Sequence, residues 1–163
     1  MNRPHEYASI SLIPKEGVSQ LIDPLIKVDG DGHRIQIVSF FAEWCPNCMY
    51  EAVSIQSLYN EYKTQRVGMT LVMDYAPRSD SDQFIHDYKI NIPVQYGEMH
   101  EKDEIGRSHT VFYKFRKFLG DERGWGLPTH LIIEKEGNKI GVIFGEIIES
   151  EIRSYLNKKL ISL

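Results

Sequence analysis

The chain contains very little cysteine, with two residues of this type among 163. A single pair can close at most one disulfide, so the sequence excludes a small secreted fold that depends on a framework of disulfides. The six histidines are scattered singly along the chain. A four-ligand zinc site built from closely spaced Cys and His residues is therefore excluded as well, and we expect no bound metal. Because no second disulfide can form, cysteine usage leaves the redox compartment open.

Long apolar runs and an excess of charge of one sign are also lacking. No apolar run approaches the ~20 residues that a membrane-spanning helix needs. The net charge of -4 provides no positive footprint for nucleic acid or for an anionic membrane surface. Hydrophobic content of 42% and charged content of 26% are typical of soluble globular proteins. We expect one domain over residues 1–163, a monomer without a nucleic-acid partner and without membrane insertion of this segment.

The N-terminal region has little regular pattern. Residues 1–6 lack the apolar core of a signal peptide, so we expect either a cytoplasmic protein or an extracytoplasmic one whose leader is absent from this chain. Residues 1–16 are typical of an extended arm that ends near Pro14. Glycine and proline favour turns in residues 17–33. There, Asp29-Gly30-Asp31-Gly32 is interpreted as a hairpin turn, because the rest of a calcium-loop pattern is missing.

Apolar periodicity predicts strands that alternate with helices along the rest of the chain. Residues 34–41, which contain the apolar run 35–41, are typical of a strand buried on both faces. Residues 46–64 carry an apolar stripe at helical spacing. Further strands are predicted at 68–74, 92–94, 129–135 and 139–145, and further helices from about 79, over 110–119 and from about 150. The stripe of the helix over 110–119 is predicted to be Val111, Phe115 and Phe118. This order predicts an α/β fold whose sheet is covered on both faces.

Both cysteines lie in the segment Trp44-Cys45-Pro46-Asn47-Cys48, between the first predicted strand and the helix that follows it. A Cys-x-x-Cys pair at such a junction is typical of a dithiol that opens and closes a disulfide. We expect the first thiol to be exposed at the start of the helix, where the helix N-terminus favours its thiolate. A structural disulfide is a poorer interpretation, because closing so short a loop stabilises the fold very little. Two inert buried thiols are the other alternative.

Several segments together resemble the thioredoxin superfamily over about residues 18–160. They are the run from Phe40 to Cys48, the later Gly126-Leu127-Pro128-Thr129 and the order of the elements. Glu51, three residues after the second cysteine, and the segment 88–94 resemble the TlpA/ResA-like branch of extracytoplasmic thiol-disulfide oxidoreductases. The resemblance implies a thioredoxin fold, a central mixed β-sheet flanked by helices. Here an N-terminal extension and a long segment 95–127, inserted before the cis-proline, would be added to it.

Other positions depart from this pattern. Ser39 stands where cytosolic thioredoxins carry a buried aspartate, which argues against an ordinary cytosolic thioredoxin. Ala52 and Val53 follow Glu51 where many relatives have a proline that kinks the helix. The length of the segment before Pro128 suggests a specialised substrate surface.

The resemblance also assigns roles to the motif residues. Cys45 would be the nucleophile that attacks a substrate disulfide, and Cys48 would resolve the mixed disulfide. Glu51 would manage the proton of the Cys48 thiol; the alternative is an ordinary exposed helix glutamate. Asn47 adds no positive charge beside the thiols, so the motif favours a reductant over a strong oxidant. No cofactor is expected beyond the redox-active disulfide between Cys45 and Cys48.

The expected substrate-binding residues surround the disulfide. They are Trp44, Pro46, Trp125, Leu127, Pro128 and Thr129. Pro128 would be the cis-proline of this fold, turning the backbone of Leu127 outwards to pair with an extended substrate segment. His130 is interpreted as a core or surface histidine, and a position behind the active site facing Ser39 is the alternative.

These features predict a thiol-disulfide oxidoreductase that reduces protein disulfides outside the cytoplasm and is itself reduced by an upstream thiol reductant. Other interpretations stay open. The chain could be a cytosolic thioredoxin-like reductant, or an interaction module with an idle dithiol. A thioredoxin-fold copper chaperone is a further alternative, although such chaperones use a wider Cys-x-x-x-Cys spacing with a distant histidine.

Overall fold

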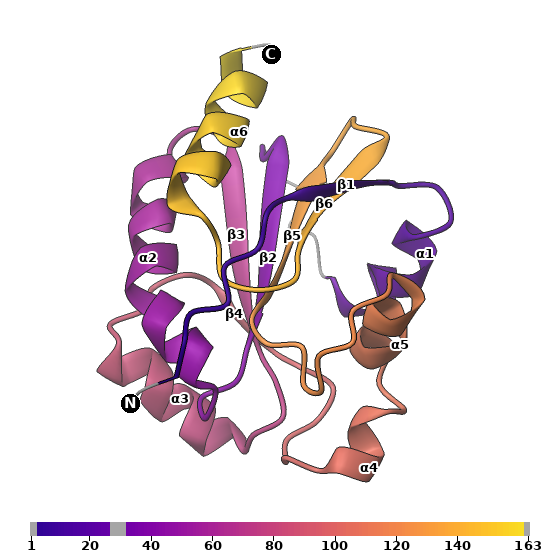
Figure 1. Ribbon diagram of the computed structural model, residues 1–163. Helices are drawn as coiled ribbons and strands as arrows, with labels where there is room; N and C mark the ends of the chain where they lie inside the picture. Colours follow the sequence, from indigo (N-terminus) through magenta and orange to yellow (C-terminus); the bar gives the residue numbers. More distant parts are fainter. Residues whose placement is uncertain (1–2, 27–31, 162–163) are drawn as a thin grey trace.

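A computed structural model describes residues 3–26 and 32–161 of the chain. The described residues form one six-stranded sheet in the order β1-β6-β5-β2-β3-β4 (Figure 1). The strands are β1 (Ser11–Pro14), β2 (Ile35–Phe41), β3 (Val67–Met73), β4 (Val94–Tyr96), β5 (Thr129–Glu134) and β6 (Lys139–Ile143). Strand β2 pairs in parallel with β3 and antiparallel with β5, so the sheet is mixed. The predicted α/β fold with a central mixed sheet is confirmed.

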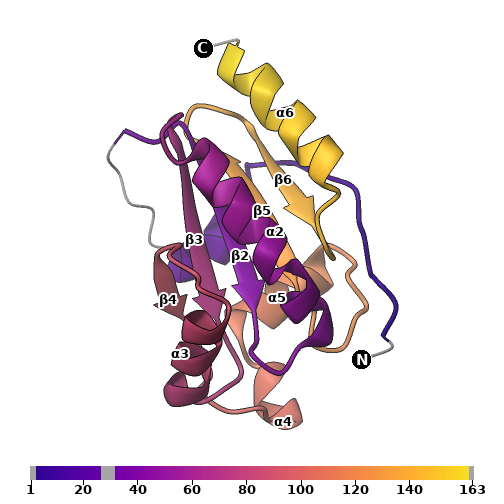
Figure 2. The ribbon, with the colours of Figure 1, turned by 90° about the vertical axis from the view of Figure 1, so that its left-hand side faces the viewer.

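Helices cover both faces of this sheet. They are α1 (Ser19–Ile22), the 3-10 turn η1 (Asp23–Leu25), α2 (Pro46–Tyr62), α3 (Arg78–Asp87), α4 (Glu104–Arg107), α5 (Val111–Phe118) and α6 (Glu149–Ile161). Helices α2 and α6 lie on one face, while α1 and α5 lie on the other (Figures 1 and 2). The sheet is therefore the middle layer of three, and its central strands are shielded from water on both sides.

Strand β2 occupies the centre because all seven of its residues are buried. A strand buried on both faces favours apolar side chains at consecutive positions, and five of the seven residues of β2 are apolar. The other two, Gln36 and Ser39, are buried polar residues that form side-chain hydrogen bonds. Its end leads directly into Cys45 and α2, as the sequence pattern predicts. In the register with β5, Ser39 lies opposite His130. The predicted short segment at 92–94 leads into β4, which is an edge strand of the sheet.

The N-terminal region is more regular than its sequence suggests. Within the expected extended arm, β1 pairs antiparallel with β6 and covers that edge of the sheet. The turns expected in residues 17–33 are in part the short helices α1 and η1, because Val18 and Ile22 turn into the core. Most of the predicted turn Asp29-Gly30-Asp31-Gly32 lies outside the described residues, so that prediction stays open.

The long segment 95–127 folds into α4 and α5, on the side of the sheet away from α2 (Figure 2). The predicted helix over 110–119 is confirmed, but its predicted stripe is wrong in part. Phe115 is buried as expected, whereas Phe118 is 67% exposed and Phe112 is fully buried instead. The ring of Phe112 stacks on that of Phe40 at a centroid distance of 4.4 Å. This contact with β2 decides which side of the helix faces the core.

Candidate active site

The two cysteines lie where β2 passes into α2. Cys45 is the N-cap residue of α2, and its Sγ accepts a hydrogen bond from the backbone N–H of Cys48 at 3.3 Å. Both are free thiols. The thiol of Cys45 also donates to the carbonyl oxygen of Leu127 at 3.6 Å. The fold thus brings the motif and the segment around Pro128 to one place.

The expectation that Cys45 is exposed is wrong. Cys45 is 4% exposed and Cys48 is fully buried, so the two differ in access by much less than expected. Cys45 nevertheless lines a surface cavity of about 370 Å³, which Cys48 does not reach. The cavity is lined by Arg3, Glu6, Trp44, Cys45, Pro46, Asn47, Lys102, Arg123, Gly124, Trp125, Gly126 and Leu127. The N-terminal arm and the inserted segment supply part of its wall, which is why the thiol is largely covered.

The environments of the two thiols separate their pKa values. The hydrogen bond from the Cys48 thiol is the largest influence on Cys45, and together with the backbone N–H groups of Cys48 and Asn47 it lowers the pKa of Cys45 despite burial. Burial is the largest influence on Cys48 and raises its pKa well above the usual value; the neighbouring Cys45 and the carboxyl of Glu51 raise it further. The thiol of Cys45 is therefore the more acidic of the two, and the thiol of Cys48 the less acidic.

Glu51 is not the exposed helix residue that one interpretation allowed, because it is 2% exposed. Its Oε1 accepts a hydrogen bond from the backbone N–H of Ile147 at 2.9 Å. The same oxygen lies 2.9 Å from Nε2 of His130, in a contact outside hydrogen-bonding geometry. Its second oxygen, Oε2, is buried without a hydrogen-bond partner among the described residues. A buried carboxylate with a vacant acceptor thus lies one helical turn after Cys48.

His130 is buried in the core and also faces Ser39, so its two interpretations hold together. Its exposure is 0%, and its Nδ1 lies 2.7 Å from the hydroxyl of Ser39. This contact follows from the register of β2 with β5, which places the two residues opposite each other. The position where Ser39 replaces an expected buried aspartate is therefore occupied by a serine–histidine pair.

The segment around Pro128 is held by α5 and by its own side chains. The Leu127–Pro128 peptide bond is cis. Thr129 is fully buried; its hydroxyl donates to the carbonyl of Gly126 at 2.6 Å and accepts from Arg123 at 2.8 Å. The expectation that Thr129 binds substrate does not fit this burial, since the side chain faces inwards and holds the loop.

An aromatic wall stands beside Cys45. The rings of Trp44 and Trp125 meet edge to face at a centroid distance of 5.3 Å. The indole N–H of Trp44 donates to the carbonyl of Tyr75 at 3.0 Å, which fixes the ring. Lys102 lies 3.8 Å from the centroid of Trp44, and Arg107 lies 4.7 Å from that of Trp125. The inserted segment therefore supplies cations to the wall of the cavity.

Sequence reasoning missed a buried carboxylate on the other side of the motif. Glu146 is 2% exposed and accepts from the side chain of Asn47 at 3.0 Å. His5 and the backbone N–H of Glu6 also bind it, at 2.8 Å and 2.6 Å. Asn47 additionally donates to the carbonyl of Pro4 at 3.0 Å. No motif surrounds Glu146 in the sequence, so only the folded chain shows that it ties the arm to the dithiol helix.

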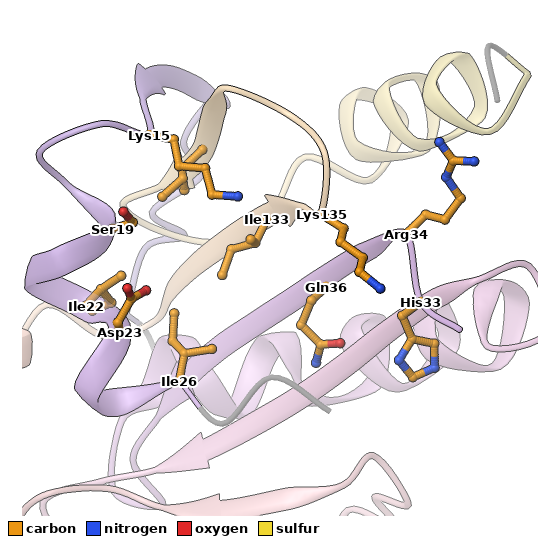
Figure 3. Close-up of a pocket in the computed structure, with 11 residues that line it drawn as sticks. Lys15, Ser19, Ile22, Asp23, Ile26, His33, Arg34, Gln36, Ile133 and Lys135 are labelled. Atoms are coloured by element: carbon orange, nitrogen blue, oxygen red, sulfur yellow. The ribbon is translucent and has the colours of Figure 1, made fainter. Parts of the chain in front are cut away.

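Two further cavities lie outside the dithiol cavity. One, of about 530 Å³, reaches Glu51 and Glu146 and is bordered by His5, Tyr7 and Tyr50. The other, of about 320 Å³, lies near the beginning of β2, where Ile22, Gln36 and Ile133 contribute to its lining (Figure 3). Because the cysteines follow the opposite end of β2, this last cavity is separate from the redox site.

The chain is similar to known proteins over most of its length. Residues 26–140 match the AhpC/TSA family. Over 142 residues the chain is 32% identical to the thiol-disulfide oxidoreductase ResA of Oceanobacillus iheyensis. That alignment covers 87% of this chain but only 64% of the length of the relative.

Solved structures agree in fold. A thiol:disulfide interchange protein of the thioredoxin family from Chlorobium tepidum TLS superposes with a TM-score of 0.59 at 18% identity, over 98% of this chain and 99% of that one. A thioredoxin-related protein from Neisseria meningitidis serogroup B superposes with a TM-score of 0.62 at 19% identity, over 85% and 93%. At this identity these likenesses show a shared thioredoxin fold.

In the described residues, no helix combines the length and apolar character that crossing a bilayer requires. The dithiol at the start of α2 and the similarity to ResA agree with the predicted resemblance to the TlpA/ResA-like branch. With most of its length matched, the chain belongs to the AhpC/TSA family.

Proposed function

We propose that this protein reduces disulfides in protein substrates outside the cytoplasm, using Cys45 and Cys48 and no other cofactor. The observation that carries the proposal is the asymmetry of the dithiol. Cys45 lines a cavity and has a lowered pKa, while Cys48 lies behind it with a raised pKa. The thiolate is the attacking form, so this arrangement presents one nucleophile and keeps the second thiol in reserve.

The reaction follows from this order. The Cys45 thiolate attacks one sulfur of the substrate disulfide, forms a mixed disulfide and releases the other substrate sulfur as a thiolate. Cys48 then loses its proton and attacks Sγ of Cys45, which releases the second substrate thiolate. The Cys45–Cys48 disulfide that remains has passed two electrons to the substrate. An upstream thiol reductant restores the dithiol.

Glu51 is suited to accept the proton that Cys48 loses. It lies three residues after Cys48 on α2, is 2% exposed and has an oxygen without a hydrogen-bond partner in the described structure. Protonation gives the carboxyl group an O–H that it can donate, which the charged form lacks. Glu51 is therefore proposed as the general base of the second step.

The substrate would bind in the cavity beside Cys45. Trp44, Pro46 and Trp125 provide apolar surface there. The carbonyl oxygen of Leu127 accepts a hydrogen bond from the Cys45 thiol. The backbone of Leu127 is therefore close enough to pair with a substrate backbone beside the disulfide. Pro128 follows it through the cis bond, and Thr129 holds the loop from inside.

A glutathione redox titration of the Cys45–Cys48 couple tests the direction of the reaction. Asn47 brings no positive charge to the dithiol and is engaged with Glu146, so we expect a reduction potential nearer that of thioredoxin, about -270 mV, than that of DsbA, about -120 mV. Cys45→Ser should abolish the two-electron transition. A potential above about -170 mV would contradict the reductase and favour an oxidase.

The compartment rests on the resemblance to the extracytoplasmic branch and on Ser39 in place of a buried aspartate. A cytosolic thioredoxin-like reductant is the competing function. Fractionation of cells that express the full-length gene distinguishes them. Recovery of the protein only in the cytoplasm would favour the competitor.

A further inference from the structure

Three buried side chains form a chain behind the dithiol. Ser39 from β2, His130 from β5 and Glu51 from α2 are each no more than 2% exposed. Nδ1 of His130 lies 2.7 Å from Ser39 Oγ, and Nε2 lies 2.9 Å from Glu51 Oε1. The polar groups thus continue one another from the sheet to the helix that carries both cysteines.

Two polar atoms of these three side chains are unsatisfied. Nε2 of His130 and Oε2 of Glu51 are buried, and neither has a hydrogen-bond partner among the described residues. Leaving a buried polar atom without a partner destabilises the fold, so such atoms are rare in a folded core unless the site uses them. Here the two unsatisfied atoms belong to neighbouring groups that can both carry a proton. Protonation turns Oε2 from an acceptor into a donor, and Nε2 is a donor or an acceptor according to whether it carries a proton.

Ser39 allows His130 to exist in either charge state. Its hydroxyl can donate to Nδ1 of a neutral imidazole, which leaves a proton on Nε2 that faces Glu51. It can also accept from an Nδ1–H, both in the imidazolium and in the neutral tautomer whose Nε2 carries no proton. Because Nδ1 keeps Ser39 as its partner in all three forms, His130 can gain or lose a proton at Nε2 without leaving its other nitrogen unpaired.

Several other groups face these three side chains from the elements packed around them. Cys48 lies on the same helix as Glu51, and the Glu51 carboxyl raises its pKa. Glu146, which follows β6, and His5 of the N-terminal arm border the 530 Å³ cavity that also reaches Glu51. The side chain of His5 is 48% exposed, so this cavity leads from the buried carboxylate towards solvent. The ring of Phe41 packs edge to face against the ring of His130, with a distance of 6.2 Å between the ring centroids.

We propose that His130 is a positioning residue for the resolving step: held by Ser39, it orients the Glu51 carboxylate and shares the proton that Cys48 gives up. The inference rests on the proposed function, since it concerns its second half. As Cys48 attacks Sγ of Cys45, the new sulfur–sulfur bond forms and the bond to the substrate sulfur breaks. The Cys48 proton passes to the Glu51–His130 pair and then to water. The substrate sulfur leaves with the electron pair of the broken bond.

Stopped-flow reaction with dithiobis(nitrobenzoate), a disulfide that releases a coloured thiolate, separates the two steps. The first phase depends on reagent concentration and reports attack by Cys45. The second does not depend on concentration and reports resolution by Cys48. We expect His130→Phe to slow the second phase about tenfold near neutral pH, because Glu51 is no longer held in place to accept the Cys48 proton. For the same reason, the rate of the second phase should reach half of its maximum at a higher pH than in wild type. The first phase should stay within about twofold of wild type.

His130→Gln separates holding from proton sharing. The amide can donate a hydrogen bond to Glu51 but cannot carry the extra proton. We expect it to recover most of the rate at high pH while its pH profile stays different from wild type. A profile identical to wild type for either variant, with only a lowered melting temperature, would show that His130 merely packs and would overturn the proposal.

Coupling to Glu51 gives a second, independent measurement. The double variant Glu51→Gln/His130→Gln should resolve no more slowly than Glu51→Gln alone, because His130 acts through the carboxylate. Additive losses would overturn the proposal. If His130→Phe does not fold, Ser39→Ala replaces it, with a shift in the same direction expected. Absence of the first phase in the wild type would instead contradict the proposed function itself.

Discussion

At the scale of single residues, the site depends on giving two identical side chains different properties. Cys45 lies at the N-terminus of a helix and receives hydrogen bonds from the Cys48 thiol and from backbone N–H groups. Cys48 lies in the core beside a carboxylate and a second sulfur, which keeps its thiol protonated. A lowered pKa increases the fraction of Cys45 that is present as the attacking thiolate. Because Cys45 lines the cavity and Cys48 does not, an incoming thiolate that reopens the disulfide would attack the sulfur of Cys45 and displace that of Cys48.

Replacing each cysteine in turn should separate attack from resolution. Cys48→Ser lacks the resolving thiol, so a protein substrate with a disulfide should remain attached through Cys45 as a mixed disulfide. Cys45→Ser should trap little, because its remaining thiol is buried and has a raised pKa. Non-reducing electrophoresis after mild incubation measures the adduct. Equal trapping by the two variants would mean that the roles are wrongly assigned.

Removing the charge of Glu51 should change the titration of Cys48. A nearby carboxylate opposes a second negative charge, so Glu51→Gln should lower the pKa of Cys48 towards its usual range. Thiolate absorbance against pH, recorded in a Cys45→Ser background, follows this thiol alone. The exposed Glu61→Gln, farther along α2, serves as the control. Curves that superimpose in the presence and absence of the Glu51 carboxylate would remove it from the mechanism.

At the scale of elements, α5 holds the loop that carries Pro128. Arg116 is fully buried on α5, and its guanidinium binds Asp121 at 3.0 Å and the carbonyl of Arg123 at 2.9 Å. Arg123 in turn donates to the carbonyl of Pro128 at 2.9 Å. The insertion thus reaches the substrate cavity with its cations and also fixes the backbone beside Cys45. Helix and loop form one unit because a buried guanidinium requires all of these acceptors.

Removing the carboxylate from this unit should destabilise it strongly. Asp121→Asn leaves the buried Arg116 without its opposite charge, which we expect to lower the free energy of unfolding by about 3 kcal/mol. The exposed Asp87→Asn on α3 is the control and should change it by less than about 0.5 kcal/mol. Urea denaturation measures both. A loss for Asp121→Asn no larger than that of the control would contradict a structural role of the pair.

The carboxylate of Asp121 also makes the stability of the fold depend on pH. Burial alone raises the pKa of Asp121, but the hydrogen bonds and charges of Arg123 and Arg116 outweigh burial and lower it. A carboxyl with a lowered pKa in the folded state adds stability above the ordinary aspartate range, near ~3.9. That contribution is lost as the pH falls through the folded-state pKa. The difference in stability between wild type and Asp121→Asn should therefore shrink only below about pH 4.

At the scale of the whole molecule, segments distant in sequence meet at Glu146. This carboxylate follows β6, binds the N-terminal arm through His5 and Glu6, and binds α2 through Asn47. The arm also pairs as β1 with the edge of β6. The N-terminal arm and the segment after β6 are thereby tied to the helix that carries the dithiol, and the arm also lines the substrate cavity.

Glu146→Leu should therefore affect both stability and access. It leaves the donors of His5, Glu6 and Asn47 without their common acceptor, which we expect to cost about 2 kcal/mol in urea denaturation. Loosening the arm should also make alkylation of Cys45 faster. Glu149→Leu, at an exposed position of α6, is the control and should change neither. An alkylation rate equal to wild type would show that the arm does not limit access.

Local sequence determined the position of the dithiol, the α/β order and most element positions. Each depends on short-range features that survive in a single sequence: apolar runs mark β2, helical spacing marks α2, and the motif marks their junction. The prediction failed where burial depends on a partner far along the chain. Phe118 faces solvent because Phe112 contacts Phe40, and Cys45 is covered by the arm and the insertion.

Tertiary structure alone decided which polar groups stand behind the cysteines. The register of β2 with β5 places Ser39 opposite His130, and packing of α2 across that pair brings in Glu51. A shift of one residue in that register would turn His130 to the other face of the sheet, and no local pattern specifies the pairing partner. Glu146 meets Asn47 for the same reason, since long-range packing, not periodicity, determines which buried donors and acceptors satisfy each other.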